Sequence, residues 1–274
     1  MEFFMGSVLP YGAFSVFLGG VLFRVSGWLR TPVPFQLTLF SVPRNRIGKI
    51  CLIFSEVLLC RTLFRQDKLL WVWVWLFHLS LFMVIFGHLF GIFYLRDQFC
   101  LVGFRPEQSQ VLSVFLGGIW GTLMALSLLA LLYRRIFNLE VRRLSSPDSY
   151  FDLLLLLAIT LTGIFMYAPG FHPELHDVRA YMAGLLLFDP IPLPHSPIFV
   201  AHFLLVSLLL LYFPFSRLVH LAGFLVIRLM LVEAPPEYPI PGHKRPRSIF
   251  TISKFQPEIP LFSKNSVKRE GRSV

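Results

Sequence analysis

The chain alternates between long apolar segments and short polar segments rich in arginine and lysine. A helix that crosses about 30 Å of hydrocarbon needs about 20 mostly apolar residues. Five segments meet or nearly meet this length: Val8 to Leu29, Leu69 to Leu95, Val111 to Tyr133, Tyr150 to Ala168 and Pro197 to Ile227. The first is too long for a signal peptide and lacks a small-residue cleavage site. The pattern predicts an all-α integral membrane protein, a bundle of five transmembrane helices.

Basic side chains concentrate on one side of this predicted bundle. The regions Arg30 to Lys68, Arg134 to Arg143 and Arg228 to Arg272 hold 20 of the 25 arginines and lysines. The opposite side holds three, which are Arg96, Arg105 and Arg179. Because arginine and lysine are retained on the cytoplasmic side of membranes, we expect the N-terminus outside and the basic C-terminal tail in the cytoplasm.

The chain divides into two predicted regions. Residues 1–228 form the five-helix membrane domain, and residues 229–274 form a Pro-rich basic cytoplasmic tail. The last 40 residues hold seven prolines and eight basic residues against three acidic ones, which is typical of an extended arm. Two short helices are expected outside the spans, an amphipathic one at 47–58 and an interfacial one at 179–188.

Composition supports a membrane location. Hydrophobic residues make up 55% of the chain, charged residues 15%, and the mean hydropathy is +0.68. A net charge of +10 alone would suit a nucleic-acid partner, but 30 phenylalanines and the apolar segments favour lipid. The cysteines, Cys51, Cys60 and Cys100, form no Cys-x-x-Cys pair. Any iron–sulfur cluster is therefore expected in another subunit.

Four histidines lie inside predicted spans: His78 and His88 in the second, His202 and His220 in the fifth. Ionisable groups at membrane depth are costly and mark functional sites. A single neutral histidine bonded across helices would commonly be structural. Four histidines on two helices favour a shared function.

Depth pairs two of these histidines near the outer side. At 1.5 Å per residue, His88 lies about 12 Å from Arg96 at the outer end of its span. His202 lies about 8 Å inside Pro197, at the outer end of the fifth span. These two imidazoles are therefore expected at a similar outer depth.

The other two histidines match on the inner side. His78 lies about 15 Å from Lys68, and His220 lies about 12 Å from Arg228. Since the second and fifth spans run antiparallel, each level offers one imidazole from each helix. Bis-histidine ligation of haem iron requires this arrangement, so the sequence predicts two stacked haems.

Rotation about the helix axes supports the pairing in part. Eighteen residues are five whole turns, so His202 and His220 are predicted to face the same way. Ten residues bring His88 only to within about 80° of His78. Pro214 marks a plausible bend in the fifth span.

Arginine and the remaining histidines complete the candidates. Arg217, one turn before His220, and Arg24 are candidates to neutralise the propionates of the inner haem. The alternative is that these side chains extend to the membrane interface, and this alternative is favoured for Arg24. No Cys-x-x-Cys-His motif is present, so b-type haems are expected. The other histidines, His172, His176, His195 and His243, receive no role, because no third metal ligand accompanies His172 and His176.

The motifs around the four histidines resemble a known family. They are Phe77-His78-Leu79, Gly87-His88-Leu89-Phe90-Gly91, His202, and Pro214-Phe215-Ser216-Arg217-Leu218-Val219-His220. They resemble the gamma (cytochrome b) subunit of respiratory nitrate reductase and related dihaem membrane subunits. Those relatives include subunits of the sulfite-reduction-associated complex, of similar transmembrane redox complexes and of heterodisulfide reductase. The resemblance covers residues 8–228, and the histidine spacings of ten and eighteen make it specific.

This resemblance implies particular cofactors and partners. The outer pair is His88 with His202, and the inner pair is His78 with His220. A quinol or menaquinol site is implied beside the outer haem, without a selected quinone-binding residue. A cytoplasmic iron–sulfur subunit is implied on the inner side, with further membrane and outer-face redox subunits in some complexes. The long segment 41–68 and the tail from Pro235 favour a heterodisulfide-reductase-like partner over a nitrate-reductase-beta-like one.

Two other classes of function remain open from the residues alone. A transporter or channel could use the histidines as a proton relay or metal path, although the spans offer few acidic or amide side chains for a pore. A structural anchor could recruit a cytoplasmic enzyme through its basic segments. Both alternatives predict a colourless protein.

Overall fold

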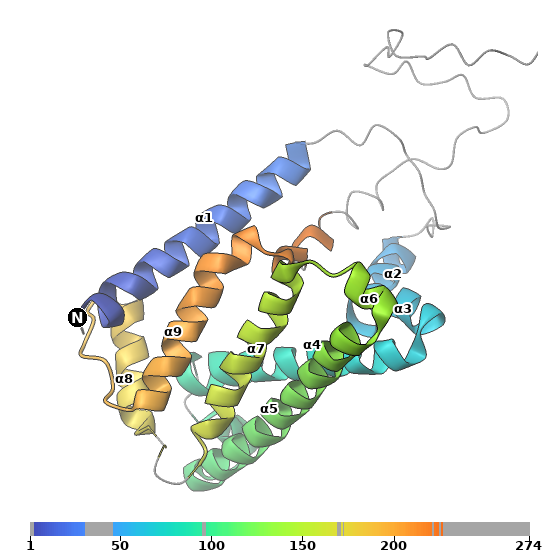
Figure 1. Ribbon diagram of the computed structural model, residues 1–274. Helices are drawn as coiled ribbons and strands as arrows, with labels where there is room; N and C mark the ends of the chain where they lie inside the picture. The colour runs from blue at the N-terminus through green and yellow to red at the C-terminus, as the bar shows by residue number, and fades with distance from the viewer. Residues whose placement is uncertain are drawn as a thin grey trace, which may run out of the picture.

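The computed structural model describes residues 3–30, 46–94, 97–168, 171, 173–220, 222–224 and 226. This part of the chain is helical and contains no β-strand. Its α-helices are α1 (Leu9–Arg30), α2 (Arg46–Leu59), α3 (Arg61–Gln66), α4 (Lys68–His88), α5 (Pro106–Phe137), α6 (Leu139–Arg143), α7 (Pro147–Phe165), α8 (Leu175–Leu186) and α9 (Pro197–Tyr212) (Figure 1). Short π- or 3-10-helical turns are η1 (Phe4–Val8), η2 (Leu89–Tyr94), η3 (Gln98–Val102), η4 (Phe213–Phe215) and η5 (Arg217–Val219).

Five helical segments are long and apolar enough to cross a membrane, which confirms the predicted number of spans. They are Phe4–Arg30, Lys68–Ile92, Pro106–Phe137, Pro147–Phe165 and Pro197–Phe215. Large apolar side chains such as Phe23 and Phe82 are exposed on their outer surfaces. Lipid tails are as apolar as leucine, so such exposure carries no penalty in a bilayer. The predicted tail, 229–274, lies outside the described residues.

The fifth span ends earlier than its hydropathy predicts. Helix α9 stops at Tyr212, not Ile227, because Pro214 lacks an N–H and its ring clashes with a preceding carbonyl. Ser216 is extended, with φ −88° and ψ 175°, and its hydroxyl accepts a hydrogen bond from the Leu218 N–H. The bend predicted at Pro214 is confirmed, but the helix ends there, so His202 and His220 do not share one helix face as their spacing predicts. His220 lies beyond α9, after a second 3-10 turn.

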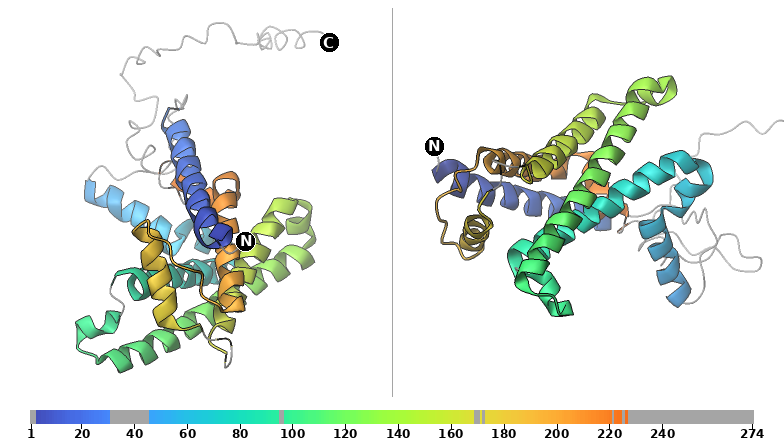
Figure 2. Two further views of the ribbon diagram at one scale, coloured as in Figure 1. Left: turned by 90° about the vertical axis from the view of Figure 1, so that its left-hand side faces the viewer. Right: turned by 90° about the horizontal axis from the view of Figure 1, so that it is seen from below.

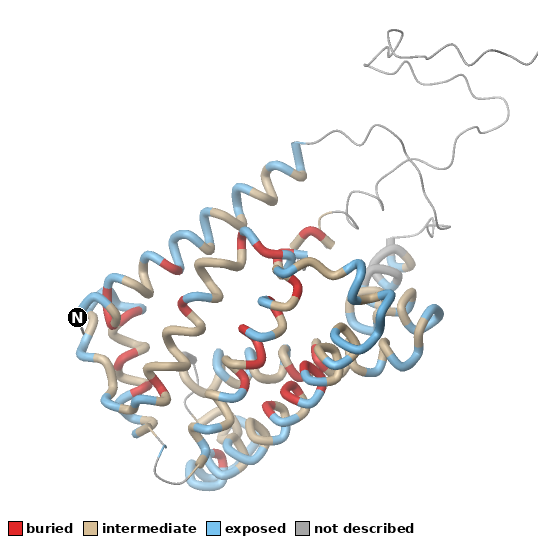
Figure 3. Tube along the Cα trace, in the orientation of Figure 1, coloured by how far each residue is buried: buried red, intermediate tan, exposed pale blue. Residues whose placement is uncertain are grey.

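The spans pack in the order α4, α5, α7, α9 and α1. Figures 1 and 2 show α1 lying along α9, at the opposite edge from α4. Buried residues gather on α5 and α7 (Figure 3), where one core cluster is formed by Phe77, Met124, Ala125, Leu128, Leu156 and Leu157. Helices α4 and α9 pack mainly against their neighbours in this order, and Leu209 of α9 packs against the core cluster that includes Phe77 of α4.

Short helices are present at both expected places: α2 covers 47–58, whereas α8, Leu175–Leu186, begins four residues before the expected helix at 179–188 and ends two residues earlier. Helix α8 packs against α9 through Tyr181 and Phe199, and the Tyr181 hydroxyl donates a hydrogen bond to the Gly6 carbonyl. Burial raises the pKa of Tyr181, so this donor stays protonated. Helices α2 and α3 lie beside the start of α4, where the Trp71 indole N–H donates to the Leu59 carbonyl. In Figure 1, α8 and the N-terminus lie at the opposite end of the bundle from α2, α3 and α6.

Candidate functional site

The four predicted histidines meet in two pairs. The rings of His88 and His202 are nearly parallel, at 17°, with centroids 6.5 Å apart. The rings of His78 and His220 are nearly perpendicular, at 86°, with centroids 6.1 Å apart. These are the two pairings that depth along the spans predicts. Helix α4 therefore faces α9 at one level and the segment after η5 at the other.

The two imidazoles on α4 each form a hydrogen bond from Nδ1 to a backbone carbonyl of the same helix. The Nδ1 of His78 lies 2.7 Å from the carbonyl oxygen of Val74, and the Nδ1 of His88 lies 2.7 Å from that of Val84. A carbonyl only accepts hydrogen bonds, so Nδ1 carries the proton in both rings. The Nε2 atom of each ring then has a free lone pair, as a metal ligand requires.

The partner imidazoles are held in the same tautomer. The Nδ1 of His220 lies 3.0 Å from the backbone oxygen of Arg217. The Nδ1 of His202 lies 3.0 Å from the Ile159 carbonyl oxygen on α7. Each pair thus consists of two rings whose Nδ1–H groups donate to backbone carbonyls, and whose Nε2 atoms are available.

Helix α7 supports His202 through residues that the sequence analysis missed. The Thr162 hydroxyl donates to the carbonyls of Ala158 and Ile159, so its oxygen accepts from His202 Nδ1 at 3.0 Å. Gly163 lets the ring pack against the helix backbone, since a Cβ there would lie 3.4 Å from His202 Cε1. Thr162 and His202 are 40 residues apart, and no local sequence pattern links them.

The pairs fit a haem better than a bare metal ion. Among the described residues, no three His, Cys, Asp or Glu side chains converge on a point, whereas a protein zinc site needs three or four ligands. A porphyrin supplies four nitrogens and needs only two axial ligands. A metal between two opposed imidazoles lies about 2 Å from each nitrogen, and each centroid lies about 1 Å behind its nitrogen. The expected centroid separation is then about 6 Å, which matches both pairs.

Arg217 has partners other than a haem propionate. Its Nε lies 2.9 Å from Asp148 Oδ2, and its Nη2 donates to the Ser146 hydroxyl at 2.7 Å. The Arg217 and Asp148 side chains are both substantially exposed. Arg217 thus ties η5 to the start of α7 while its carbonyl accepts from His220. Arg24, the second arginine candidate, is partly buried on α1.

A buried carboxyl group near the inner pair was also missed. Asp152, on α7, is 7% exposed, and Tyr212 on α9 lies close to it, with its ring packed on that of the adjacent Phe151 at 4.9 Å. Its Oδ1 has no hydrogen-bond partner within the described chain. The available sequence signal was an aspartate within an apolar span, which is a functional-site candidate by itself.

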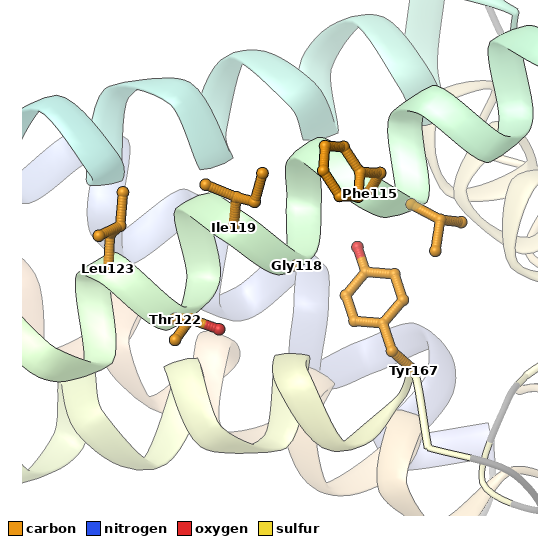
Figure 4. A pocket seen from close by; sticks show the side chains of 7 residues that line it. Phe115, Gly118, Ile119, Thr122, Leu123 and Tyr167 are labelled. Carbon is orange, nitrogen blue, oxygen red and sulfur yellow. The ribbon is translucent and has the colours of Figure 1, made fainter.

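A shallow apolar pocket of about 550 Å³ lies between α5 and the end of α7 (Figure 4). Its polar atoms are the hydroxyls of Tyr167 and Thr122, and the other lining residues are Val114, Phe115, Gly118, Ile119 and Leu123. Burial raises the pKa of Tyr167, so its hydroxyl remains a neutral donor. The pocket lies on the first half of α5.

The remaining histidines stay outside these sites. His176 is exposed beside Asp177, 3.4 Å away, and His195 lies in the loop before α9. His172 and His243 lie outside the described residues.

Five apolar spans that carry two imidazole pairs, in each of which one ring is exposed, define a multi-pass membrane protein with two paired ligand positions. The family model of the nitrate reductase gamma subunit matches residues 60–233, which include all four histidines. The chain belongs to this family. It is a multi-pass protein of the cytoplasmic membrane.

The chain is similar to subunits of two kinds of complex, named as menaquinol oxidoreductase and nitrate reductase. The Hdr-like menaquinol oxidoreductase cytochrome b-like subunit of Archaeoglobus fulgidus is 29% identical, over 94% of this chain and 86% of the relative. The subunit of the same name from Archaeoglobus profundus is 24% identical, over 96% and 86%. The nitrate reductase gamma chain of Bacillus subtilis is 25% identical, over 78% and 87%.

Proposed function

We propose that this protein is the dihaem b-type cytochrome subunit of a membrane-bound quinol/quinone oxidoreductase complex. It exchanges electrons between a quinone, with menaquinone favoured, and a cytoplasmic iron–sulfur subunit. The observation that carries this proposal is the pair of facing imidazole couples, His88 with His202 and His78 with His220, near 6 Å. The names of the relatives, a menaquinol oxidoreductase subunit and nitrate reductase gamma chains, support the same class.

Each imidazole couple has the chemistry of an axial ligand pair. When bound, a haem would supply reversible one-electron transfer, and the two imidazole couples would hold one haem each at different depths of the bilayer. The chain fixes each ring through an Nδ1–H bond to a carbonyl, which sets its orientation and raises its basicity. Thr162 adds a second acceptor at His202. Arg217 places a positive charge beside His220 and also serves as a propionate partner in this proposal, in competition with Asp148.

The proposed orientation follows the basic residues. One end of the bundle carries α3, α6 and the start of α4. The basic residues at this end are Arg61, Arg65, Lys68, Arg134, Arg135, Arg142 and Arg143. By the positive-inside rule this end faces the cytoplasm, and the N-terminus and α8 lie outside. Oxidation of a quinol at the outer level would then release its two protons outside, separating them from the electrons.

The proposed domain division and partner follow from this orientation. Residues 1–228 form the membrane domain, and the basic tail 229–274 extends into the cytoplasm. The cytoplasmic iron–sulfur partner docks on the basic inner face. A heterodisulfide-reductase-like partner is favoured, since the two Archaeoglobus relatives are named Hdr-like. Further membrane and outer-face redox subunits belong to the proposed complex.

A difference spectrum of the purified protein tests this function. We expect dithionite reduction to produce the absorption bands of low-spin b-type haem, because both axial positions are imidazoles. Adding a menaquinol analogue should reduce the same haems. The two alternatives, a histidine-based transporter and a non-redox anchor, predict no visible spectrum. A folded, colourless preparation from haem-replete cells would reject the proposal.

A further inference from the structure

Asp152 is a carboxyl group inside the membrane domain without an ion-pair partner of its own among the described residues. At 1.5 Å per residue it lies about 8 Å inside the start of α7. It is 93% buried, since only 7% of its surface is exposed. An unpaired charge at this depth is costly. A carboxyl group retained there is therefore a candidate for proton binding.

Four neighbouring groups bear on its charge, one on its own helix and three on surrounding elements. Tyr212 on α9 packs against the adjacent Phe151, and Asp148 lies one turn earlier on α7. Arg217 on η5 and Arg135 on α5 contribute positive potential. A low-dielectric interior and a like charge favour the neutral carboxyl form, whereas a nearby positive charge favours the carboxylate. A change of charge close to Asp152 therefore shifts its affinity for a proton.

Both arginines are committed to other partners. Arg217 binds Asp148 at 2.9 Å. Arg135 donates to the Ser145 hydroxyl at 3.2 Å, and its guanidinium lies 6.0 Å from the centre of the Tyr150 ring. The Asp152 oxygen without a partner, Oδ1, is thus free to carry a hydrogen.

Asp152 is linked to the inner imidazole pair through a short series of contacts. The backbone oxygen of Arg217 accepts from His220 Nδ1 at 3.0 Å, and its guanidinium binds Asp148. Tyr212, which packs on Phe151 beside Asp152, ends α9 immediately before the turns that lead to His220. A change of charge at the His78–His220 level therefore acts on Asp152 through the low-dielectric interior.

A route to water is also present. Asp148 lies at the first turn of α7, and its side chain is 42% exposed. It stands one turn from Asp152, between the buried carboxyl and the aqueous end of the helix. Carboxylates in such a position exchange protons with solvent and pass them along the helix face.

We propose that Asp152 is a redox-linked proton-binding site beside the inner imidazole pair. One proton from the cytoplasmic side binds Asp152 when one electron reaches the haem held by His78 and His220, and leaves when the electron leaves. The proton compensates the added negative charge. This inference rests on the proposed function, because it requires haem at the inner pair.

Redox titration of both haems in the intact protein tests this site. Between about pH 6 and pH 8, the reduction potential of the inner haem should fall as pH rises. The slope should approach about 59 mV per pH unit, the value for one proton bound per electron. Asp152→Asn should flatten this slope and leave the outer haem unaffected. The control is Thr160→Val, which changes another buried polar residue of α7 that bonds its own helix. It should retain the slope.

Infrared difference spectra between the reduced and oxidised states provide an independent readout. We expect a carboxylic-acid C=O band to appear on reduction, to shift in D₂O and to move in Asp152→Glu. It should be absent in Asp152→Asn. The Glu variant keeps the test decisive if the Asn variant fails to assemble.

The outcomes separate this inference from the function on which it rests. A pH-independent inner potential in the wild-type protein, with both haems bound, overturns the proton site alone. So does an infrared band that Asp152→Glu leaves in place. Variants that lower only the melting temperature would show that Asp152 has a purely structural role. Absence of haem from the wild-type protein overturns both proposals.

Discussion

The imidazole rings of His78 and His220 face each other with centroids 6.1 Å apart, although His220 lies beyond the end of α9. The break after Tyr212 is therefore part of the candidate site. A continuous α9 would give His220 a different height and direction. The residues that fix this break should affect the inner pair before the outer one.

Gly20 is expected to maintain the break through its contact with Pro214. A Cβ on Gly20 would lie 2.5 Å from Pro214 Cβ, which forces α1 and the turn apart. Gly20→Ala should lower stability by about 1–3 kcal/mol, as overpacking does, and should weaken the inner haem first. Thermal unfolding followed by haem absorbance measures both effects.

The adjacent glycine provides a matched control. No atom lies within 4 Å of a Cβ built on Gly19. Gly19→Ala should leave haem binding unchanged and should not lower stability, since alanine favours helix over glycine by up to about 1 kcal/mol. Equal losses in the two variants would contradict a specific role for the Gly20–Pro214 contact.

The Arg217–Asp148 pair should tune the inner haem more than it stabilises the fold. Both side chains are substantially exposed, so the pair contributes only about 0–1 kcal/mol to folding. Arg217→Gln should lower the potential of the inner haem by removing a positive charge, and Asp148→Asn should raise it. Redox titration resolves the two signs. Shifts of the same sign, or a larger shift of the outer haem, would be inconsistent with this placement.

Thr162 should tune the outer haem. Its oxygen accepts from His202 Nδ1, which strengthens the imidazole as a donor to ferric iron. Thr162→Val should raise the potential of the outer haem by the equivalent of about 1 kcal/mol or less, because the Ile159 carbonyl remains as an acceptor. Thr160→Val is the control, and a shift of equal size in that variant would argue against the Thr162 contact.

The native cysteines report the orientation. Cys51 lies on α2 and Cys60 follows it, whereas Cys100 lies in η3 at the other end of the bundle. In single-cysteine variants, a membrane-impermeant thiol reagent should label Cys100 from outside the cell and Cys51 only in inverted vesicles. Cys60 should react slowly at neutral pH, since burial raises the pKa of its thiol. Labelling of Cys51 in intact cells would reverse the proposed orientation.

Much of this arrangement could be predicted from the sequence because spans and depth are one-dimensional properties. Apolar length defined the five spans, and counting residues from their charged ends paired His88 with His202 and His78 with His220. The end of α9 could not be located, because hydropathy continues through Pro214 while the backbone does not. Thr162 was missed because its partner lies on another helix. Asp152 was missed although an aspartate within an apolar span is itself a signal of a functional site.

The haem content of single histidine variants tests the central claim most directly. We expect about two haem b per chain in the wild-type protein by pyridine haemochrome assay, since each imidazole couple binds one. His202→Ala or His88→Ala should leave about one haem, the inner one, and His78→Ala or His220→Ala should leave the outer one. His176→Ala, which changes an exposed histidine, should keep both. Full haem content in any of the four variants would contradict the assignment of that ligand.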